Sequence, residues 1–264
     1  MDLQLTGKRA LVSGSTAGIG YAIAEALGKE GANVVVNGRT AQRVEQAIAS
    51  LKKAGLRGNV DGLPADLGTA AGASLVIQKF PEVDILVNNL ATFDPKPFEE
   101  IPDTEWMGIF EVNVLSGVRL SRHYLPGMKK RNWGRIVFIS SESGIQIPSE
   151  MIHYGMTKTA QLAVSRGLAE TTAGTGVTVN TVLPGPTTSE GALRFLDNMA
   201  TAQKKTLKEI ETEFFQNLRP TSLLRRFAAP EEVAALVTFV CSPRSSATNG
   251  AALRVEGGVV RSIV

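Results

Sequence analysis

The chain has 264 residues, 43% hydrophobic and 20% charged, and its 28 basic residues against 25 acidic ones give a net charge of +3. These values suit one globular domain, and the basic residues are too scattered for a nucleic-acid binder. A single cysteine, two separated histidines and no apolar run near the roughly 20 residues of a bilayer span give no sign of a disulfide, a metal site or a membrane helix. The strand pattern starts almost at the N-terminus, so we expect a cytoplasmic protein without a signal peptide.

Short Val-, Ile- and Leu-rich runs alternate with longer helical patterns along the chain. Strands are predicted at 9–14, 32–39, 59–65, 83–89, 133–141, 176–185 and 250–258. A first helix is expected over 19–31, ending at Gly31, and a second from Thr40, a suitable N-cap, to about residue 54. Runs that are apolar on both faces and joined by helices indicate a parallel sheet covered on both sides. The sequence therefore predicts an α/β fold: one doubly wound, Rossmann-type domain over 1–264 with a seven-stranded parallel sheet.

The alternation stops between Pro184 and Pro230, where the pattern becomes mostly helical. One interpretation is an ordinary pair of surface helices. The other is a mobile helical cap over a substrate pocket, at about 186–226, because this segment follows the carboxyl end of a strand, where such sheets bind ligands.

The first strand leads into a glycine-rich turn, VSGSTAGIG, which contains Gly14, Gly18 and Gly20. Glycines let the backbone turn tightly and approach a pyrophosphate, and the next helix offers free N–H groups and the positive end of its dipole. A tight connection without a ligand is the alternative. The setting between a strand and a helix favours a dinucleotide site.

The end of the second strand bears on the choice of cofactor. An acidic residue there would hold the adenosine ribose hydroxyl of NAD. This chain instead has Gly38 followed by Arg39, and a guanidinium can bind a 2′-phosphate through two charge-assisted hydrogen bonds. NADP(H) is therefore favoured, with NAD(H) possible if Arg39 is only a solvated loop charge.

Further short motifs follow in a fixed order: NNLA at 88–91, VNV around Asn113, ISSESG at 139–144, YGMTK at 154–158, VTVNTVLPG at 177–185 and GG at 257–258. Together with the glycine turn, they resemble the short-chain dehydrogenase/reductase family over essentially the whole chain. The resemblance is strongest to its 3-oxoacyl-thioester reductase-like branch, a label that covers many substrates.

The resemblance implies a role for each matching position. The catalytic tetrad would be Asn113, Ser141, Tyr154 and Lys158, with Ser141 preferred over Ser140 and Ser143 because it lies 13 residues before Tyr154. The implied cofactor contacts are Gly14, Ser15, Thr16, Gly18, Ile19, Gly20, Arg39, Asp66, Leu67, Asn89, Tyr154, Lys158 and Thr187. Asp66 and Leu67 would lie near adenine, Asn89 near the adenosine ribose and Thr187 near the nicotinamide carboxamide.

Some positions depart from the family pattern. Leu90 and Thr92 alter the usual NNAG motif close to the cofactor, and their effect on its fit is open. Ala17 stands where many NADP-using relatives carry Arg or Lys, which weakens the NADP(H) prediction. Glu256 replaces the more usual Asp before the final glycines, a change that should preserve the turn.

Tyr154 and Lys158 are four residues apart, so on a helix they lie on one face. A free phenol has a pKa near 10, and our hypothesis is that the Lys158 ammonium and the positive nicotinamide favour the phenolate. Tyr154 would then exchange a proton with the substrate oxygen, Ser141 would stabilise that oxygen, and Asn113 could hold a water connected to Lys158.

The leading functional hypothesis is an NAD(P)(H)-dependent oxidoreductase that moves hydride between nicotinamide and a small-molecule carbonyl or secondary alcohol. The alternative is a cofactor-binding regulatory or structural protein without turnover. A third interpretation is a lyase or epimerase that uses bound cofactor transiently. The family resemblance also implies a homotetramer or homodimer, formed through the helices around 102–130 and 152–174 and the C-terminal segment. Composition and residue spacing predict no nucleic-acid, membrane or metal partner.

Overall fold

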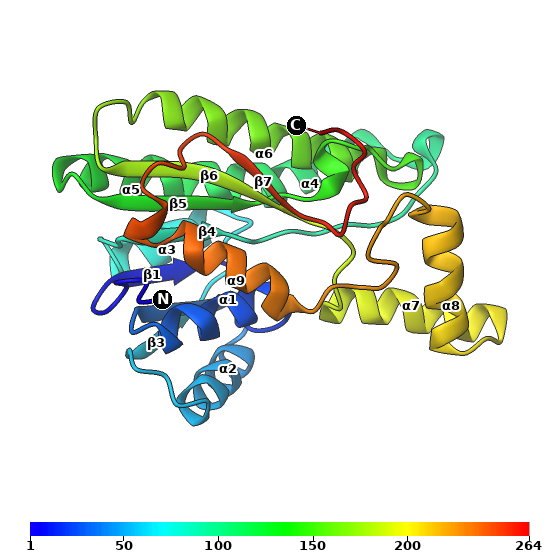
Figure 1. Ribbon diagram of the computed structural model, residues 1–264, viewed down its shortest axis with the longest axis horizontal. Coiled ribbons are helices and arrows are strands. Elements are labelled where there is room, and N and C mark those ends of the chain that lie inside the picture. The colour runs from blue at the N-terminus through cyan, green and yellow to red at the C-terminus, as the bar shows by residue number, and fades with distance from the viewer. Residues whose placement is uncertain (264) are drawn as a thin grey trace.

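The fold centres on one parallel sheet. The computed structural model describes residues 1–263, apart from the side chains of Arg194 and Phe195. Within them the sheet has seven strands in the order β3-β2-β1-β4-β5-β6-β7 (Figure 1). The strands are β1 (Arg9–Val12), β2 (Asn33–Gly38), β3 (Val60–Pro64), β4 (Ile85–Asn88), β5 (Gly134–Ile139), β6 (Val177–Pro184) and β7 (Ala252–Val255). All neighbours pair in parallel, so the predicted fold class is confirmed.

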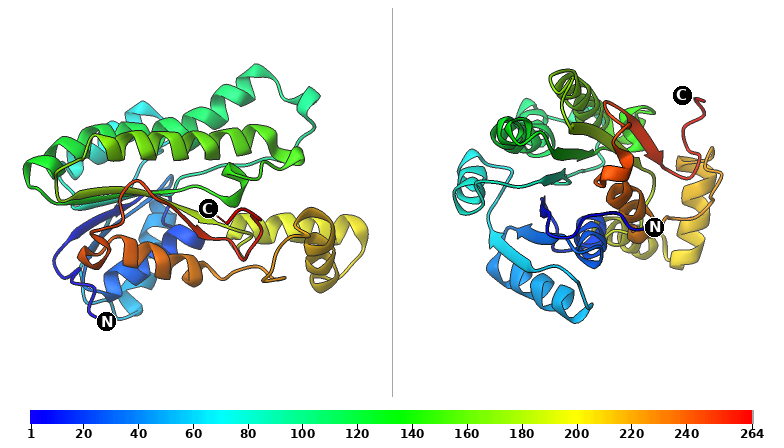
Figure 2. Two further views of the ribbon diagram at one scale, coloured as in Figure 1. Left: turned by 45° about the horizontal axis from the view of Figure 1, so that its top comes forward. Right: turned by 60° about the vertical axis from the view of Figure 1, so that its left-hand side comes forward.

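Helices cover both faces of this sheet (Figure 2). The α-helices are α1 (Gly18–Lys29), α2 (Ala41–Lys53), α3 (Ala70–Lys79), α4 (Asp103–Phe110), α5 (Ser116–Lys130), α6 (Ile152–Glu170), α7 (Glu190–Gln203), α8 (Leu207–Glu213) and α9 (Pro230–Val240). Short helical turns are η1 (Phe98–Glu100), η2 (Glu111–Leu115), η3 (Glu142–Gly144), η4 (Ser149–Met151), η5 (Phe214–Leu218) and η6 (Pro243–Ser245), of which η2 and η5 are π-helical. Within residues 1–263, no helix has the length and apolar character needed to cross a membrane.

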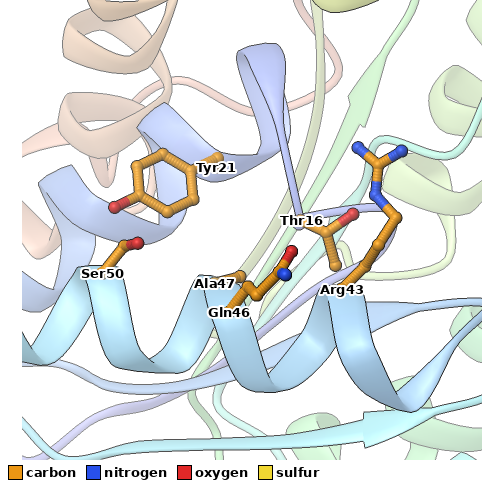
Figure 3. A pocket seen from close by; sticks show the side chains of 6 residues that line it. All are labelled: Thr16, Tyr21, Arg43, Gln46, Ala47 and Ser50. Atoms are coloured by element: carbon orange, nitrogen blue, oxygen red, sulfur yellow. The ribbon is translucent and has the colours of Figure 1, made fainter.

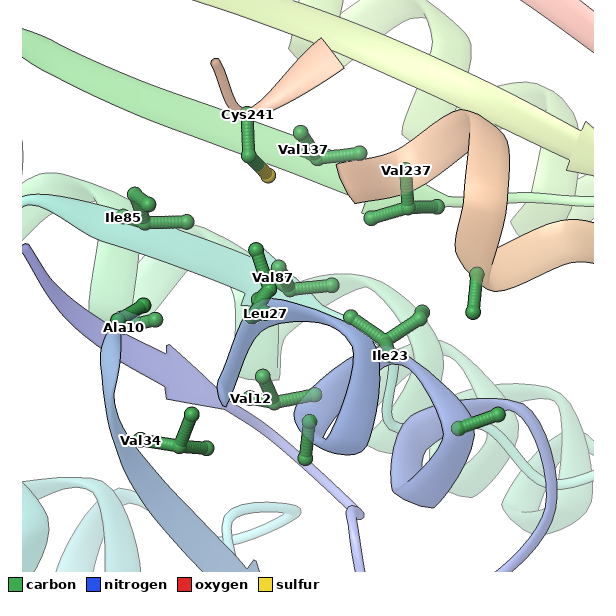
Figure 4. Packing of buried hydrophobic residues seen from close by; sticks show 14 of the residues in the cluster. Ala10, Val12, Ile23, Leu27, Val34, Ile85, Val87, Val137, Val237 and Cys241 are labelled. Atoms are coloured by element: carbon green, nitrogen blue, oxygen red, sulfur yellow. The ribbon is translucent and has the colours of Figure 1, made fainter. Parts of the chain in front are cut away.

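The strand side chains explain the two layers. Alternate residues of a strand point to opposite faces, and in β1 Val12 packs with α1 and α9 while Leu11 packs with α3 and α5. Figure 4 shows the first of these clusters, in which Val12, Val87 and Val137 of three strands lie beside Ile23 of α1 and Val237 of α9. Each fully buried Val or Ile side chain contributes roughly 1.5–3 kcal/mol of transfer free energy, which is why these strands are apolar on both faces.

The element boundaries differ slightly from the predicted ones. The strands are up to three residues shorter at their ends, so Ser13–Gly14 and Ser140–Ser141 belong to loops at the carboxyl edge of the sheet. Helix α1 stops at Lys29, and Gly31 follows with φ +93°, a conformation that a residue with a side chain rarely adopts. Thr40 caps α2 as expected, because its side chain accepts a hydrogen bond from the Arg43 N–H.

The mostly helical segment after β6 contains α7, α8 and η5, which extend beyond the carboxyl edge of the sheet (Figures 1 and 2). A small apolar cluster holds the segment together, formed by Leu196, Ile210, Phe215 and Phe227. The segment therefore has its own core and lies at the sheet edge that collects the predicted site residues.

Candidate active site

The glycine turn forms a cradle that fits a dinucleotide phosphate. Gly14 and Gly18 have φ of +61° and +57°, and a Cβ on Gly20 would lie 2.5 Å from both Asn89 Nδ2 and the Gly14 carbonyl oxygen. Helix α1 begins at Gly18, and its N-cap residue Ala17 makes no side-chain capping bond. No side chain of the N-cap residue occupies the first N–H groups of α1, so they can donate hydrogen bonds to a phosphate.

Two of the predicted cofactor residues build this turn from within. Asn89 Nδ2 donates to the carbonyl oxygens of Ser13 (2.9 Å) and Gly14 (3.1 Å). Ser15 is fully buried, and its hydroxyl donates to the Val12 carbonyl and accepts from the Asn37 N–H. The Ser15 hydroxyl is therefore committed to the strand ends and shapes the turn.

The next residue of the turn, Thr16, faces helix α2. A pocket of about 310 Å³ lies there, between α1 and α2, and Figure 3 shows Thr16 and Tyr21 facing Arg43, Gln46 and Ser50 across it. This polar pocket is lined by Thr16, Tyr21, Arg43, Gln46, Ala47 and Ser50 and holds none of the predicted catalytic side chains.

Other predicted cofactor residues lie at the ends of neighbouring strands. Arg39 is exposed directly after β2. After β3, Leu67 is buried, while Asp66 is exposed and accepts a hydrogen bond from the Gly68 N–H. Thr187 is buried after β6 and donates to the Gly185 carbonyl, and Ile19 packs its side chain against the core under the turn.

The predicted catalytic side chains come together next to the turn. Ser141 follows β5, and Tyr154 and Lys158 lie on one face of α6. Lys158 Nζ lies 5.5 Å from the centre of the Tyr154 ring and donates to the Ile139 carbonyl at 2.9 Å. Ser141 also lies close enough to Tyr154 to affect the pKa of its phenol, while the Ser141 hydroxyl hydrogen goes to Glu142.

Asn113 lies in the π-helical turn η2, between α4 and α5. Its amide brackets the backbone of Thr92, accepting from the Thr92 N–H at 2.7 Å and donating to the Thr92 carbonyl at 2.9 Å. Such single π turns in longer helices occur often at functional sites. Asn113 therefore fixes the loop after β4, which includes one of the positions that depart from the family pattern.

Three residues that the sequence analysis did not select belong to this cluster. Gln161 accepts from Lys158 Nζ (3.3 Å) and donates to the Asn113 carbonyl (2.6 Å), so its side chain connects the two residues. Glu142 and Arg219 form a buried ion pair beside Ser141. The sequence offered only weak signs of their roles: Gln161 lies about one helical turn after Lys158, and Glu142 directly follows Ser141.

The pKa hypothesis for Tyr154 is wrong in sign for the groups that this chain supplies. Burial raises the pKa of Tyr154 and the charge of Glu142 raises it further, while the nearby Ser141 hydroxyl and the charge of Arg219 lower it by less. Burial also lowers the pKa of Lys158 to about 7, against a smaller opposing effect of Glu142. Loss of hydration is the largest cause of both shifts, and the raised pKa leaves Tyr154 a neutral phenol at neutral pH.

The lowered pKa of Lys158 predicts a pH-dependent effect of removing it. The unfolded lysine holds its proton up to pH 10.5 and the folded one up to about pH 7, so wild-type stability rises with pH between these values. We expect Lys158→Met to be more stable than wild type by a margin that is largest below about pH 7 and shrinks toward pH 10. Urea unfolding of both proteins across this range measures the margin, and a margin that does not change with pH would contradict the assignment.

Comparisons with known proteins agree with this geometry. The family model described as short chain dehydrogenase matches residues 8–200. The chain is 51% identical to the uncharacterized oxidoreductase YvaG of Bacillus subtilis (strain 168), over 100% of both chains. It is 31% identical to the 3-oxoacyl-acyl-carrier-protein reductase FabG of Aquifex aeolicus (strain VF5), over 98% of this chain and 100% of that protein.

A solved structure extends the likeness to three dimensions. L-sorbose reductase from Gluconobacter frateurii, complexed with NADPH and L-sorbose, matches with a TM-score of 0.93 and 31% identity, over 100% of both chains. With the parallel sheet, the glycine cradle and the Ser–Tyr–Lys cluster, these matches favour an oxidoreductase over a protein without turnover. The chain belongs to the short-chain dehydrogenase/reductase family and is an NAD(P)(H)-dependent oxidoreductase that acts between carbonyl and secondary alcohol groups.

Proposed function

We propose that the chain is an NADP(H)-preferring carbonyl reductase in which Ser141, Tyr154 and Lys158 carry the chemistry. The observation that supports this most directly is their convergence beside the glycine cradle. The test is oxidation of NADPH by purified protein with a panel of small ketones and aldehydes, followed by nicotinamide absorbance. Turnover that needs a carbonyl supports the proposal, whereas cofactor binding without turnover would support a regulatory protein.

The residues have separate tasks in the proposed mechanism. Bound nicotinamide supplies the hydride in reduction and accepts it in oxidation. Tyr154 gives its proton to the substrate oxygen as negative charge develops there, and its raised pKa keeps it protonated for this step. Ser141 donates a hydrogen bond to the same oxygen. Lys158 Nζ lies 5.5 Å from the centre of the Tyr154 ring, where its positive charge would stabilise the phenolate that forms when Tyr154 gives up its proton.

The raised pKa of Tyr154 also favours one direction at neutral pH. A neutral phenol is ready to donate a proton, as reduction requires, whereas oxidation of an alcohol requires a phenolate. We expect the oxidation rate to increase with pH well beyond neutrality and the reduction rate to be highest near or below it.

The preference for NADP(H) is proposed from Arg39. The nearby Arg43 is held by Glu190 at 2.5 Å, whereas Arg39 is exposed at the carboxyl end of β2, beside Gly38. A Cβ on Gly38 would lie 2.5 Å from Thr16 Cγ2, so an acidic residue at this position would have to move the Thr16 side chain. The NADPH bound by the related L-sorbose reductase supports the same choice.

Arg39→Ala should therefore weaken NADPH binding by roughly 10- to 100-fold, the effect expected for loss of a charge-assisted hydrogen bond to a phosphate. NADH binding should change by less than about threefold, because NADH has no 2′-phosphate. Fluorescence titrations of wild type, Arg39→Ala and the exposed control Arg57→Ala measure both affinities. Equal losses for the two cofactors, or none, would remove Arg39 from the phosphate site.

The segment 186–226 is proposed to be a substrate cap within the single domain 1–264. Its Ser189 touches the turn, since a Cβ on Gly18 would lie 3.4 Å from Ser189 Cβ. Gly191 in α7 faces the Phe93 ring, which in turn lies edge-on to Tyr154 with 6.0 Å between ring centres. The cap thus contacts the cofactor turn and the loop beside Tyr154, which suits a segment that encloses a small carbonyl or alcohol substrate. Assembly as a homotetramer or homodimer remains a prediction from the family resemblance.

A further inference from the structure

A buried carboxylate lies directly beside the catalytic serine. Glu142 is 5% exposed, and its Oε2 accepts the Ser141 hydroxyl hydrogen at 2.5 Å. The Ser141 oxygen also accepts from the Ser143 N–H at 3.1 Å. A hydroxyl has one hydrogen, so the hydrogen that Ser141 needs for a substrate oxygen is committed to Glu142.

Arg219 of the cap holds this carboxylate in place. Its Nε donates to Glu142 Oε1 at 3.0 Å, and its Nη1 donates to Glu150 Oε1 at 3.1 Å and to the Leu218 carbonyl at 2.8 Å. Arg219 is 7% exposed, so both members of the Glu142 pair are buried. Glu142 Oε1 is thereby satisfied by the protein, while Oε2 relies on Ser141 alone among the described side chains.

Binding a simple ketone would break this arrangement. Once Ser141 turns its hydrogen toward the carbonyl oxygen, Glu142 Oε2 loses its donor in a buried place, which is costly for a charged acceptor. Two oxygen atoms that hydrogen-bond the same hydroxyl, here Glu142 Oε2 and the substrate carbonyl oxygen, lie roughly 4 Å from each other. A hydroxyl on the carbon next to the substrate carbonyl can span that separation and donate to Oε2 in place of Ser141.

We propose that Glu142 is a specificity-determining residue that selects α-hydroxy carbonyl substrates, such as hydroxyketones and ketoses. The substrate hydroxyl replaces Ser141 as the donor to Glu142, and the released Ser141 hydrogen bonds the carbonyl oxygen that accepts the proton of Tyr154. Arg219 offsets the charge of Glu142, so a neutral hydroxyl is a sufficient donor. This inference rests on the proposed carbonyl reductase activity and names its substrate class.

The test compares hydroxyacetone with acetone and methoxyacetone, using NADPH. Methoxyacetone carries a similar electron-withdrawing oxygen but has no hydrogen to donate, so it separates hydrogen bonding from carbonyl reactivity. Wild type should prefer hydroxyacetone over both by at least about tenfold in kcat/KM, and Glu142→Gln should reduce that preference by at least about tenfold. Glu232→Gln, which removes a carboxylate from an exposed arginine pair outside the site, should retain it.

The outcomes distinguish a failure of the proposed reductase activity from a failure of the proposed role of Glu142. Turnover of all three ketones without preference in wild type, or with a preference that Glu142→Gln retains, overturns the role of Glu142 and leaves the reductase assignment standing. No turnover of any carbonyl by wild type overturns the proposed function and this inference with it. If Glu142→Gln does not fold, as judged by thermal unfolding, Glu142→Asp replaces it: the shorter carboxylate moves the acceptor away from the substrate hydroxyl, so a preference reduced by at least about tenfold supports the role of Glu142 and an unchanged preference overturns it.

Discussion

Tyr154→Phe is expected to lower kcat for carbonyl reduction by at least about a thousandfold while NADPH affinity changes by less than about threefold. The substitution removes only the hydroxyl that donates the proton, and general acid catalysis by a positioned side chain is typically worth about 10²–10⁴ in rate. The ring remains between Phe93 and Lys158, so the shape of the site should be preserved. Steady-state kinetics together with a cofactor titration separates the two effects.

The matched control is Tyr124→Phe. Tyr124 is also buried, and its hydroxyl donates to the Phe80 carbonyl at 2.8 Å, in the helical layer that contains α5. Losing this bond should lower stability by about 1 kcal/mol and leave turnover near that of wild type. If Tyr154→Phe retained more than about a tenth of wild-type kcat, another group would have to supply the proton.

Gly20→Ala is expected to weaken cofactor binding by at least about a hundredfold. The added Cβ would lie 2.5 Å from the Gly14 carbonyl oxygen, which is backbone, and 2.5 Å from Asn89 Nδ2, which is held by hydrogen bonds to the Ser13 and Gly14 carbonyls. The turn must open to relieve this overlap, which moves the N–H groups of the cradle away from the phosphate. Isothermal titration with NADPH measures the loss.

Gly167→Ala is the matched control for this change. Gly167 also lies in a helix, but a Cβ there would meet nothing within 4 Å. Alanine at such a position should stabilise the protein by roughly 0.5–1 kcal/mol and leave NADPH affinity as it is. Equal behaviour of the two variants would show that the cradle does not depend on the close approach at Gly20.

The parts that depend on local pattern could be predicted from sequence. Apolar runs such as Val34–Val36 give strands buried on both faces, and the glycine turn needs only its three small residues and the helix that follows. Tyr154 and Lys158 share a helix face because of their spacing alone. These features require no knowledge of which distant segments meet.

The parts that depend on distant contacts could not be predicted. Arg219 reaches Glu142 across 77 residues of sequence, and Gln161 meets Asn113 across 48. The sign of the Tyr154 pKa shift also escaped prediction, because the sequence shows the nearby lysine but not the burial and the Glu142 charge that raise the pKa. Exact strand ends were missed for a similar reason, since loop residues such as Ser140 are as buried as the strands they follow.

The central claim is that this protein transfers hydride from a nicotinamide cofactor to a carbonyl carbon. The most direct measurement is incubation with NADPH deuterated at the transferred position and hydroxyacetone, followed by mass spectrometry of the product. We expect a diol that carries one deuterium on the former carbonyl carbon and an equal amount of oxidised cofactor. Product without deuterium, formed without cofactor consumption, would contradict it and indicate lyase or epimerase chemistry.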